Sequence, residues 1–520
     1  VKAIEFTDIA GAIAQIKLQN NWNERTSAPL TFGMVFPKGV LSSDQTIAAK
    51  SHEAFLPTQI DVKVLHHDGT VKHAAITIEP PELDPDDIID VSFWPIETKE
   101  NPTFNGRQII EAGYTFPVSI SLYSETAPTK EISLNARDLL LDEKVQPEWL
   151  SGPLVQEFRV EKEIAAHLRV QFDVRVYRNG DIRTAVVFDN SKTFSPGIRH
   201  NVYDVIIGDK TSPAFTASKI GHHRPSNWHR VFWSLPNTSA HVIYKLEYLV
   251  STTAILPLDP TSGINAETIS DADKKLEAMP PMAPAEITKY FPSTGGRDDI
   301  GIYPRWVSNY LITQTEAARR VMMSNADAGG AVPWHYIDER TNAPISIEIR
   351  PKFWADERGL EDRYRPDQPS SDIFASSDGG WSADHSHKPD LFYIPYLVSA
   401  DHYYADELAM QAAWAIFGRW PALRVGGLKA IDVEQVRASA WSLRDISNAA
   451  WVLPDTHPSK KYLERALDQN LTLMKEKYID RQEFSGAGEL EGYFEESVYG
   501  EPERISPWQN DYVVLALWLE

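Results

Sequence analysis

The hydrophobic pattern of the chain changes its period near residue 300, and this change constrains the fold more than any other feature. Before it, short runs alternate apolar and polar residues, as in 60–65 (IDVKVL) and 168–176 (LRVQFDVRV). A period of two predicts strands with one buried face, and 67–70 (HDGT) and 178–181 (RNGD) predict hairpin turns. Beyond residue 300, apolar residues recur at helical spacing. We therefore expect a multi-domain chain whose β-rich half precedes a helical half.

The helical half is predicted to consist of stacked helical hairpins, because long amphipathic segments follow one another through short loops. The expected helices cover 303–325, 402–419, 432–452, 458–478 and 508–520. The last segment ends without a capping signal. We expect either that the natural chain continues or that the helical domain is incomplete.

Proline and glycine mark the expected domain boundaries. A Pro-rich patch at 88–102 predicts a break near residue 100, so we divide the β half into a barrel-like domain, 1–102, and a β-sandwich, 103–255. The segment 256–300 contains many Pro and Gly residues and is expected to be a linker. Residues 301–520 then form the helical domain. A chain of 520 residues is longer than one core usually supports, which agrees with several domains.

The composition argues against several kinds of binding partner. A net charge of −22 argues against nucleic acid and anionic membranes, and no apolar run reaches the roughly 18 residues of a membrane-spanning helix. No signal peptide is visible, but a chain starting at Val1 is what its removal would leave, so we expect an extracellular or periplasmic protein, with a virion surface as the alternative. The 15 Trp, 20 Tyr and 20 Phe residues suit a packed core, and such rings also stack on sugars.

Three stretches of the β half resemble a known family. They are 29–39 (PLTFGMVFPKG), 56–63 (LPTQIDVK) and 67–74 (HDGTVKHA). Together they resemble the N-terminal barrel of the exo-rhamnogalacturonan lyase and YetA-like family, although His66 and His73 stand where that family tends to have Trp. The resemblance implies a RIFT-type barrel, a central β-sandwich and a C-terminal (α/α) toroid.

Motifs in the helical half extend the resemblance. The stretches 381–390 (WSADHSHKPD), 435–445 (QVRASAWSLRD) and 507–512 (PWQNDY) are similar to uncharacterised bacterial proteins with the same β-then-toroid layout. The family layout implies polysaccharide lyase chemistry, although a fold does not by itself determine function.

One side of the expected helix 432–452 carries a stripe of cations and an aromatic ring. Arg437, Trp441, Arg444 and Asn448 follow one another at spacings of four, three and four residues, which places them on one face. Such a stripe could present cations to a carboxylate and a ring to a sugar. The alternative is that the arginines pair with acidic residues at a packed helix interface.

The loop Asp384-His385-Ser386-His387 offers the second cluster. Asp384 and His385 are weak candidates for a divalent metal, because carboxylate and imidazole bind such ions. No third ligand is identifiable, so we expect that no cofactor is required. His387 is a candidate for proton transfer, and the remaining alternative is a hydrogen-bonded structural histidine.

Three further segments could contribute to a site. His335 lies among aromatic residues in 333–336 (PWHY), and 221–230 (GHHRPSNWHR) could form the second wall of a cleft or a structural contact between domains. An acidic cluster within 488–507 could supply paired carboxylates or form a solvated loop. It contains Glu489, Glu491, Glu495 and Glu496.

We expect β-elimination of a uronate-containing polysaccharide or oligosaccharide. Arg437 or Arg444 would neutralise the uronate carboxylate, His387 or His335 would act as base, and Tyr393 or Tyr396 would act as acid. The residues expected to bind substrate are Trp381, Trp441, Trp508, Gln509, Asp511, His222, Arg224 and Trp228.

Two alternatives remain open. A glycoside hydrolase would need two carboxylates across a cleft, and a non-catalytic glycan-binding surface or virion protein would need the aromatic rings alone. The candidate carboxylates are Asp384, Asp445, Glu491 and Asp511.

Overall fold

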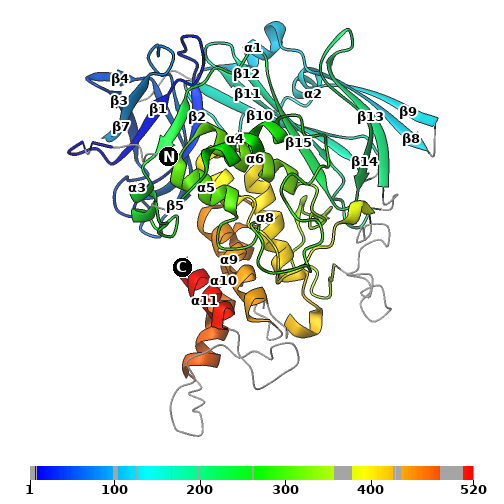
Figure 1. Ribbon diagram of the computed structural model, residues 1–520. Helices are drawn as coiled ribbons and strands as arrows, with labels where there is room; N and C mark the ends of the chain where they lie inside the picture. Colours follow the sequence, from blue (N-terminus) through cyan, green and yellow to red (C-terminus); the bar gives the residue numbers. More distant parts are fainter. Residues whose placement is uncertain are drawn as a thin grey trace.

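The computed structural model describes residues 6–7, 9–97, 104–124, 127–165, 167–195, 200–260, 263–355, 378–424, 428, 435–480 and 507–518. The change of period is borne out, because antiparallel sheets occupy the N-terminal part and helices follow them toward the C-terminus (Figure 1). Among the residues in these ranges, no helix is both long enough and apolar enough to cross a membrane.

The first β region contains two antiparallel sheets, with strand orders β16-β1-β7-β3-β4 and β2-β6-β5. The strands are β1 Ala14–Gln19, β2 Leu30–Val35, β3 Gln45–Ser51, β4 Ala54–Leu56, β5 Thr58–Leu65, β6 Val71–Ile78, β7 Ile88–Glu97 and β16 His241–Tyr244. The turn 67–70 joins β5 to β6, as predicted. β16 pairs with β1 although it follows the sandwich strands in sequence, so this sheet is completed by a segment that we had assigned to the sandwich.

The second β region is sandwich-like, with sheets ordered β10-β11-β12-β15 and β14-β13-β8-β9. Its elements are α1 Gly106–Gly113, β8 Pro117–Ser124, β9 Ala127–Asn135, α2 Ala136–Asp142, β10 Val155–Glu163, β11 Arg169–Tyr177, β12 Ile182–Asp189, β13 His200–Asp209, β14 Ser212–His223 and β15 Asn227–Trp233. Phe158, Phe172, Phe188 and Trp228 belong to the core between the two sheets.

The helical region begins earlier than predicted. Its elements are α3 Leu246–Ser251, α4 Ala266–Glu277, α5 Arg305–Thr313, α6 Glu316–Gly329, α7 Tyr393–Ser399, α8 His402–Phe417, α9 Val436–Val452, α10 Lys460–Lys475 and α11 Pro507–Leu517, with a two-stranded sheet of β17 Ile337–Asp338 and β18 Ala343–Pro344. The segment 303–325, predicted as one helix, is divided between α5 and α6, because Gln314 adopts a left-handed conformation between them.

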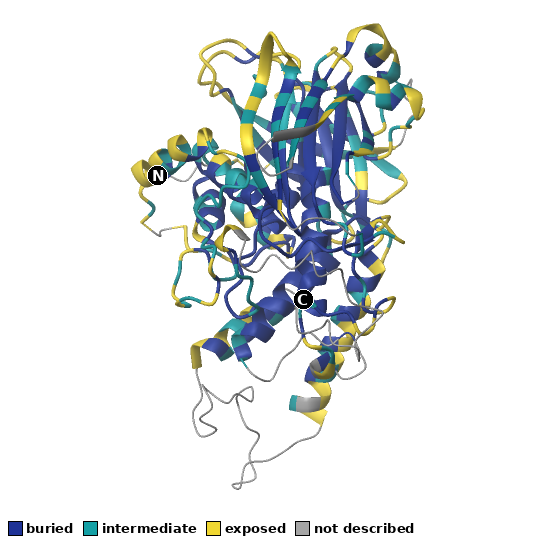
Figure 2. Cartoon of the chain, turned by 90° about the vertical axis from the view of Figure 1, so that its right-hand side faces the viewer, coloured by how far each residue is buried: buried dark blue, intermediate teal, exposed yellow. Residues whose placement is uncertain are grey.

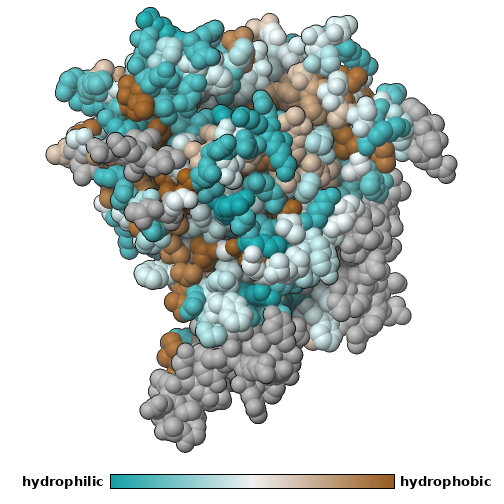
Figure 3. All heavy atoms as spheres, in the orientation of Figure 1, coloured by the Kyte–Doolittle hydropathy of each residue, from teal (hydrophilic) through white to brown (hydrophobic). Residues whose placement is uncertain are grey.

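The helix α4 lies inside the segment 256–300 that we expected to be a linker. It forms because 266–278 contains neither Pro nor Gly, and because the Asn265 side chain accepts the amide of Glu267 at 2.9 Å as an N-cap. Its buried residues are Ile269 and Leu276, and its exposed side is charged, which gives the hydrophilic surface over this helix in Figure 3.

The first β region and the helices share one hydrophobic core. A single cluster joins residues of the first sheets, such as Ile16 and Phe93, to helical residues such as Trp306 and Trp414, whereas the sandwich has a separate core. The first β region is therefore packed onto the helices and does not bury its apolar surface alone.

The strands β11 and β12 are buried on both faces, which differs from the predicted single buried face. Val170, Phe172 and Val174 face the sandwich core, while Arg169, Asp173 and Arg175 lie at alternate positions on the other face. That second face meets α8, because Arg159 pairs with Asp406 and Arg175 with Asp401, at the start of the helix. In Figure 2 the dark blue, buried strands lie directly above dark blue helices. We call the charged face of β10, β11, β12 and β15, with the helices α6 and α8 that meet it, the seam.

Candidate functional site

His387 lies in the loop that precedes α7 and forms a hydrogen bond with Asp384. The Asp384 carboxylate contacts Nδ1 of His387, which requires the proton on Nδ1 and leaves the Nε2 lone pair available. Within the described ranges, no hydrogen bond joins Nε2 to another residue. The side chains of His387 and Asp384 remain 10% and 29% exposed, so a solute can reach the pair.

Arg437 and His387 meet at Gly295. A Cβ added to Gly295 would lie 2.2 Å from Nη1 of Arg437 and 3.7 Å from Cδ2 of His387, so both side chains approach the same point. Arg437 is half-buried in the first turn of α9. In the part of the chain that the structure describes, no carboxylate lies within ion-pair distance of its guanidinium. The guanidinium donates to the side-chain oxygen of Gln435 at 3.2 Å, and within the described ranges it lies beside an oriented imidazole without a carboxylate partner, an arrangement that can receive an anionic group.

Gln509 connects α11 to the same place. Its side-chain oxygen accepts the backbone amide of Arg437 at 3.0 Å, which satisfies one of the amides that a helix start leaves without a partner. The adjacent Trp508 is 50% exposed, and Asp511 is also exposed. We call Asp384, His387, Arg437 and Gln509 the rim cluster.

The loop that carries Gly295 is fixed to the His387 loop by Arg297. This guanidinium donates to the carbonyl of His387 at 3.1 Å and to that of Phe291 at 2.8 Å, and it pairs with Asp299. One wall of the rim cluster therefore comes from 291–299, within the segment we had expected to be a linker. No sequence signal beyond the paired glycines pointed to this role.

A fully buried set of charges lies next to the rim cluster. Asp445 forms ion pairs with Lys388 at 2.9 Å and with Arg444 at 2.8 Å, and Arg444 also donates to the carbonyls of Gly301 and Lys388. Burial lowers the pKa of Lys388 to about 8, although Asp445 opposes the shift. Arg444 has no exposed surface, so it supports the His387 loop from behind and cannot meet a substrate carboxylate.

Asp390 and Asn448 extend this buried set. The Asn448 amide donates to Asp390 at 2.9 Å, which uses the last position of the predicted Arg437-to-Asn448 stripe for an internal contact. Burial raises the pKa of Asp390 to about 6, because the surrounding cations only partly offset the loss of solvent. Three of the four residues in the stripe are therefore packed inside the protein, and only Arg437 is accessible.

The aromatic candidates are divided in the same way. Trp381 and Trp441 are 1% and 0% exposed, so their ring faces contact protein, and a sugar cannot stack on them as we had expected. The hydroxyl of Tyr393 donates to the carbonyl of Ala254 at 2.6 Å, and Tyr396 is fully buried. Burial raises the pKa of both tyrosines well above the ordinary value, which removes the two expected acids.

The weak metal candidates do not form a ligand set. His385 stacks on Trp414, with ring centroids 4.1 Å apart, while Asp384 pairs with His387. Over the ranges that the structure describes, no group of three or more His, Cys, Asp or Glu residues is placed to hold a metal ion.

The candidate substrate-binding residues of the sandwich, His222, Trp228 and Arg224, contact other parts of the protein. His222 lies between the hydroxyl of Tyr203 at 2.9 Å and the carbonyl of Ser226 at 3.0 Å, and burial lowers the pKa of His222 to about 3. Trp228 stacks on Phe188 at 4.2 Å inside the sandwich core.

Arg224 is also fully buried, and its guanidinium donates to backbone carbonyls. One of them belongs to Lys192 and the other, at 3.1 Å, to Ser195. These three residues hold the sandwich together, and they lie apart from the contacts of the rim cluster.

His335 lies in the seam and not at the rim. Its Nε2 is 2.7 Å from Glu407, which also accepts the amide of Asn227 at 2.7 Å. Burial disfavours the charged form, but the Glu407 carboxylate outweighs it and raises the pKa of His335. His335 has no exposed surface and therefore no access to a substrate, and it holds Glu407, which joins α8 to Asn227 of the sandwich.

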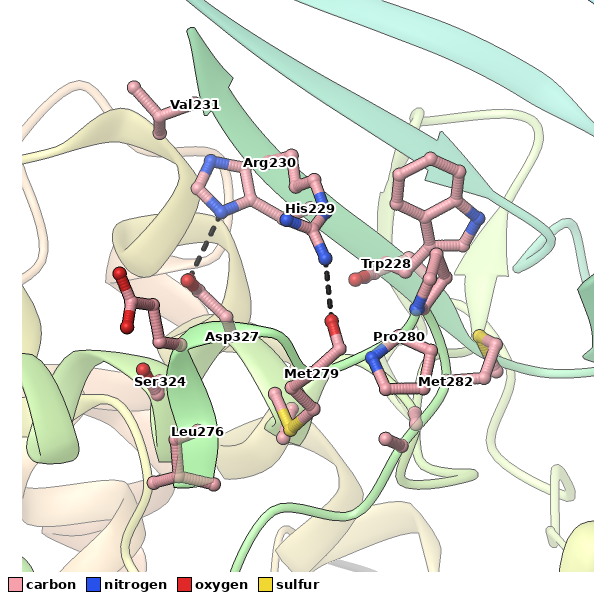
Figure 4. Close-up of a pocket in the computed structure, with 16 residues that line it drawn as sticks. Trp228, His229, Arg230, Val231, Leu276, Met279, Pro280, Met282, Ser324 and Asp327 are labelled. Carbon is pink, nitrogen blue, oxygen red and sulfur yellow. Dashed lines mark hydrogen bonds and ion pairs between the residues drawn. The ribbon is translucent and has the colours of Figure 1, made fainter. Parts of the chain in front are cut away.

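The neighbouring His229 faces a cavity at the seam. Figure 4 shows His229 directed at Asp327 of α6, at 3.1 Å, and Arg230 directed at the carbonyl of Met279, at 2.5 Å. The cavity has a volume of about 280 Å³. The run 221–230 therefore does form a wall against the helical region, through His229 and Arg230.

The described carboxylates expected for a hydrolase lie in three different environments. Asp445 is buried in its ion pairs, Asp384 is bound to His387, and Asp511 is exposed on α11. Glu491 and the other glutamates of the acidic cluster lie outside the described residues.

No protein-family model matches the chain, and no curated protein matches it in sequence.

Proposed function

We propose that the chain is a polysaccharide lyase that cleaves a uronate-containing glycan by β-elimination at the rim cluster. The observation that supports this is the approach of Arg437 and His387 to the same point beside Gly295, with Asp384 orienting the imidazole. Elimination needs a cation for the carboxylate and a base for the adjacent proton. The resemblance to exo-rhamnogalacturonan lyases supports the same chemistry, and we extend the proposal to an (α/α) toroid and to action outside the cytoplasm.

In this mechanism Arg437 binds the C6 carboxylate and makes the C5 proton more acidic. Nε2 of His387 removes that proton, the C–H electron pair forms the C4=C5 double bond, and the C4–O bond breaks. The Asp384 carboxylate stabilises the imidazolium that results. Tyr393 and Tyr396 are buried, so we assign the return of the proton to the leaving oxygen to the His387 imidazolium itself. This assignment requires that the proton and the leaving group share one face of the sugar.

The exposed ring of Trp508 is the aromatic platform in this proposal. It is adjacent to Gln509, which contacts Arg437, and it is the exposed member of the three tryptophans considered. A pyranose can stack its apolar face on such a ring while its carboxylate meets the guanidinium.

The test is incubation of the protein with a panel of uronic-acid polysaccharides, with measurement of both the unsaturated-uronate absorbance and the reducing ends. A lyase raises both signals. A rise in reducing ends alone would indicate a hydrolase, and binding with neither signal would indicate a glycan-binding protein. The matched control is His67→Ala, because His67 is exposed in a hairpin turn outside the rim cluster. His387→Ala should abolish the absorbance change while His67→Ala retains it.

A further inference from the structure

A second cavity lies where the first β region, the sandwich and the helices meet, and we call it the junction cleft. Its volume is about 280 Å³, at the small end of ligand pockets and suited to a single small ring. Its walls come from β2, β11, β12, β15 and β16 and from α5 and α6, together with the segment 398–404 before and within α8. None of the residues assigned above to the rim cluster lines it.

Aromatic rings form part of its lining. Trp22 is 43% exposed, and its indole N–H donates to the carbonyl of Ser239 at 3.0 Å, which fixes the ring. Trp233 and Tyr177 stack with centroids 5.9 Å apart and planes at 15°. Rigid ring faces of this kind favour a ligand that has an apolar face of its own.

The polar lining is charge-balanced. Arg175 and Arg183 both donate to Asp401, at 2.8 and 2.6 Å, and Arg175 also pairs with Glu157. Each of these cations is therefore already neutralised by a carboxylate, and an anionic ligand would have to break a buried ion pair to reach one.

The α6 side of the cleft repeats this pattern. Glu316 lies 2.6 Å from His241 and 3.7 Å from Arg319, and Tyr404 donates to Asp327 at 2.7 Å. These groups hold one another in place without using all of their hydrogen-bonding capacity. The carboxylates keep free lone pairs, and the guanidinium groups keep free N–H donors. They can exchange hydrogen bonds with hydroxyl groups without any change in net charge.

We propose that the junction cleft binds an uncharged saccharide unit, distinct from the uronate handled at the rim cluster. A neutral sugar ring combines an apolar face for Trp22 and Trp233 with hydroxyls for the paired charges around Asp401 and Glu316. The inference goes beyond the proposed elimination, because it concerns a different cavity and is measured without turnover.

The experiment is titration of the whole chain with methyl glycosides of neutral hexoses and 6-deoxyhexoses and with their short oligomers, followed by tryptophan fluorescence and calorimetry. Free glucuronate and galacturonate form the charged arm. We expect saturable binding of at least one neutral glycoside. Trp22→Ala should weaken it about tenfold, because it removes one aromatic contact at an exposed position that the fold does not need.

The matched control is Trp518→Ala, which removes another exposed tryptophan, 70% exposed against 43% for Trp22, that does not line the cleft. This variant should bind as the wild type does, and so should His387→Ala even if elimination is lost. Three results would overturn the proposal: no neutral glycoside binds, only the uronates bind, or Trp22→Ala binds with unchanged affinity. Failure of the lyase assay alone would not contradict saccharide binding in the junction cleft, so the two proposals can be disproved independently.

Discussion

The rim cluster and the seam both contain arginines close to carboxylates and histidines, but they differ in how the charges are paired. In the seam, Arg175 and Arg183 converge on Asp401, and these groups are buried. At the rim, Arg437 is half-buried and has no carboxylate partner among the described residues. Removing one member of a buried ion pair strongly destabilises the fold, whereas an accessible cation without a carboxylate partner can exchange bound water for a ligand. Among the described residues, pairing therefore distinguishes the cations that hold the seam together from Arg437, the cation to which we assign the uronate in the proposed function.

The first prediction concerns stability in the seam. Asp401→Ala should lower the free energy of unfolding by about 3 to 5 kcal/mol, because it leaves two buried guanidinium groups without their shared carboxylate. Urea denaturation of Asp401→Ala and Arg437→Ala gives the comparison, and Arg437→Ala should cost less than about 1 kcal/mol.

A matched control for the seam is Glu348→Ala. Glu348 also pairs with an arginine, Arg465, but both side chains are substantially exposed. Its loss should cost about 1 kcal/mol or less. If Asp401→Ala were no more destabilising than Glu348→Ala, the seam would not be the structural region that we describe.

The second prediction concerns catalysis at the rim. His387→Ala should reduce kcat by about 100-fold or more, the usual contribution of a general base, while the unfolding transition stays close to that of the wild type. Steady-state kinetics on the best polysaccharide of the panel measures this effect. His335→Ala should behave in the opposite way, with a large loss of stability, because it strips Glu407 of its buried partner. An active His387→Ala variant would remove the rim cluster from the mechanism.

The third prediction uses pH to distinguish two carboxylates whose pKa values are shifted in opposite directions, Asp390 behind the rim cluster and Glu316 in the junction cleft. The folded pKa of Asp390 is raised to about 6, so its contribution to stability is greatest below the unfolded value of 3.8 and is lost as pH rises through 6. Burial opposes the charged form of Glu316 as well, but His241 and Arg319 outweigh it and hold its pKa at about 2. The contribution of Glu316 is present above 4.5 and is lost as pH falls toward 2.

Denaturation at pH 2, pH 4 and pH 7 tests this contrast. Between pH 4 and pH 7, the free energy of unfolding of the wild type should fall by on the order of 2 kcal/mol relative to that of Asp390→Asn. Relative to Glu316→Gln, it should gain stability as pH rises from about 2 to 4.5. A difference from Asp390→Asn that does not change with pH would show that Asp390 is not buried as described.

The fourth prediction concerns the geometry of the rim. Gly295→Ala places a Cβ 2.2 Å from the Arg437 guanidinium, which must leave its present position beside Gly295. The guanidinium is the end of a flexible side chain, so we expect little loss of stability but about a tenfold fall in kcat/KM. Gly296→Ala is the matched control, because its Cβ would meet nothing within 4 Å. Equal kinetics of the two variants would separate Arg437 from the reaction.

The sequence predicted which residue types the candidate site contains, but it did not predict which of those residues are accessible. Arg437, Trp441, Arg444 and Asn448 do lie on one helix, as their spacing indicates, yet packing against α11 and the His387 loop leaves only Arg437 accessible. Helical spacing shows which residues share a face. It does not show which part of that face a neighbouring helix covers.

The sequence by itself determined strands such as β11 and helices such as α9, because alternation and helical spacing are local properties of the chain. Only the tertiary structure decided that the charged face of β11 is buried against α8. The compensating charge, Asp401, is 226 residues from Arg175 in sequence, and no local pattern links them. The same holds for Gly295, whose role follows only from the distant side chains of Arg437 and His387 that meet there. Long-range pairing decides which polar residues are structural and which are free for function.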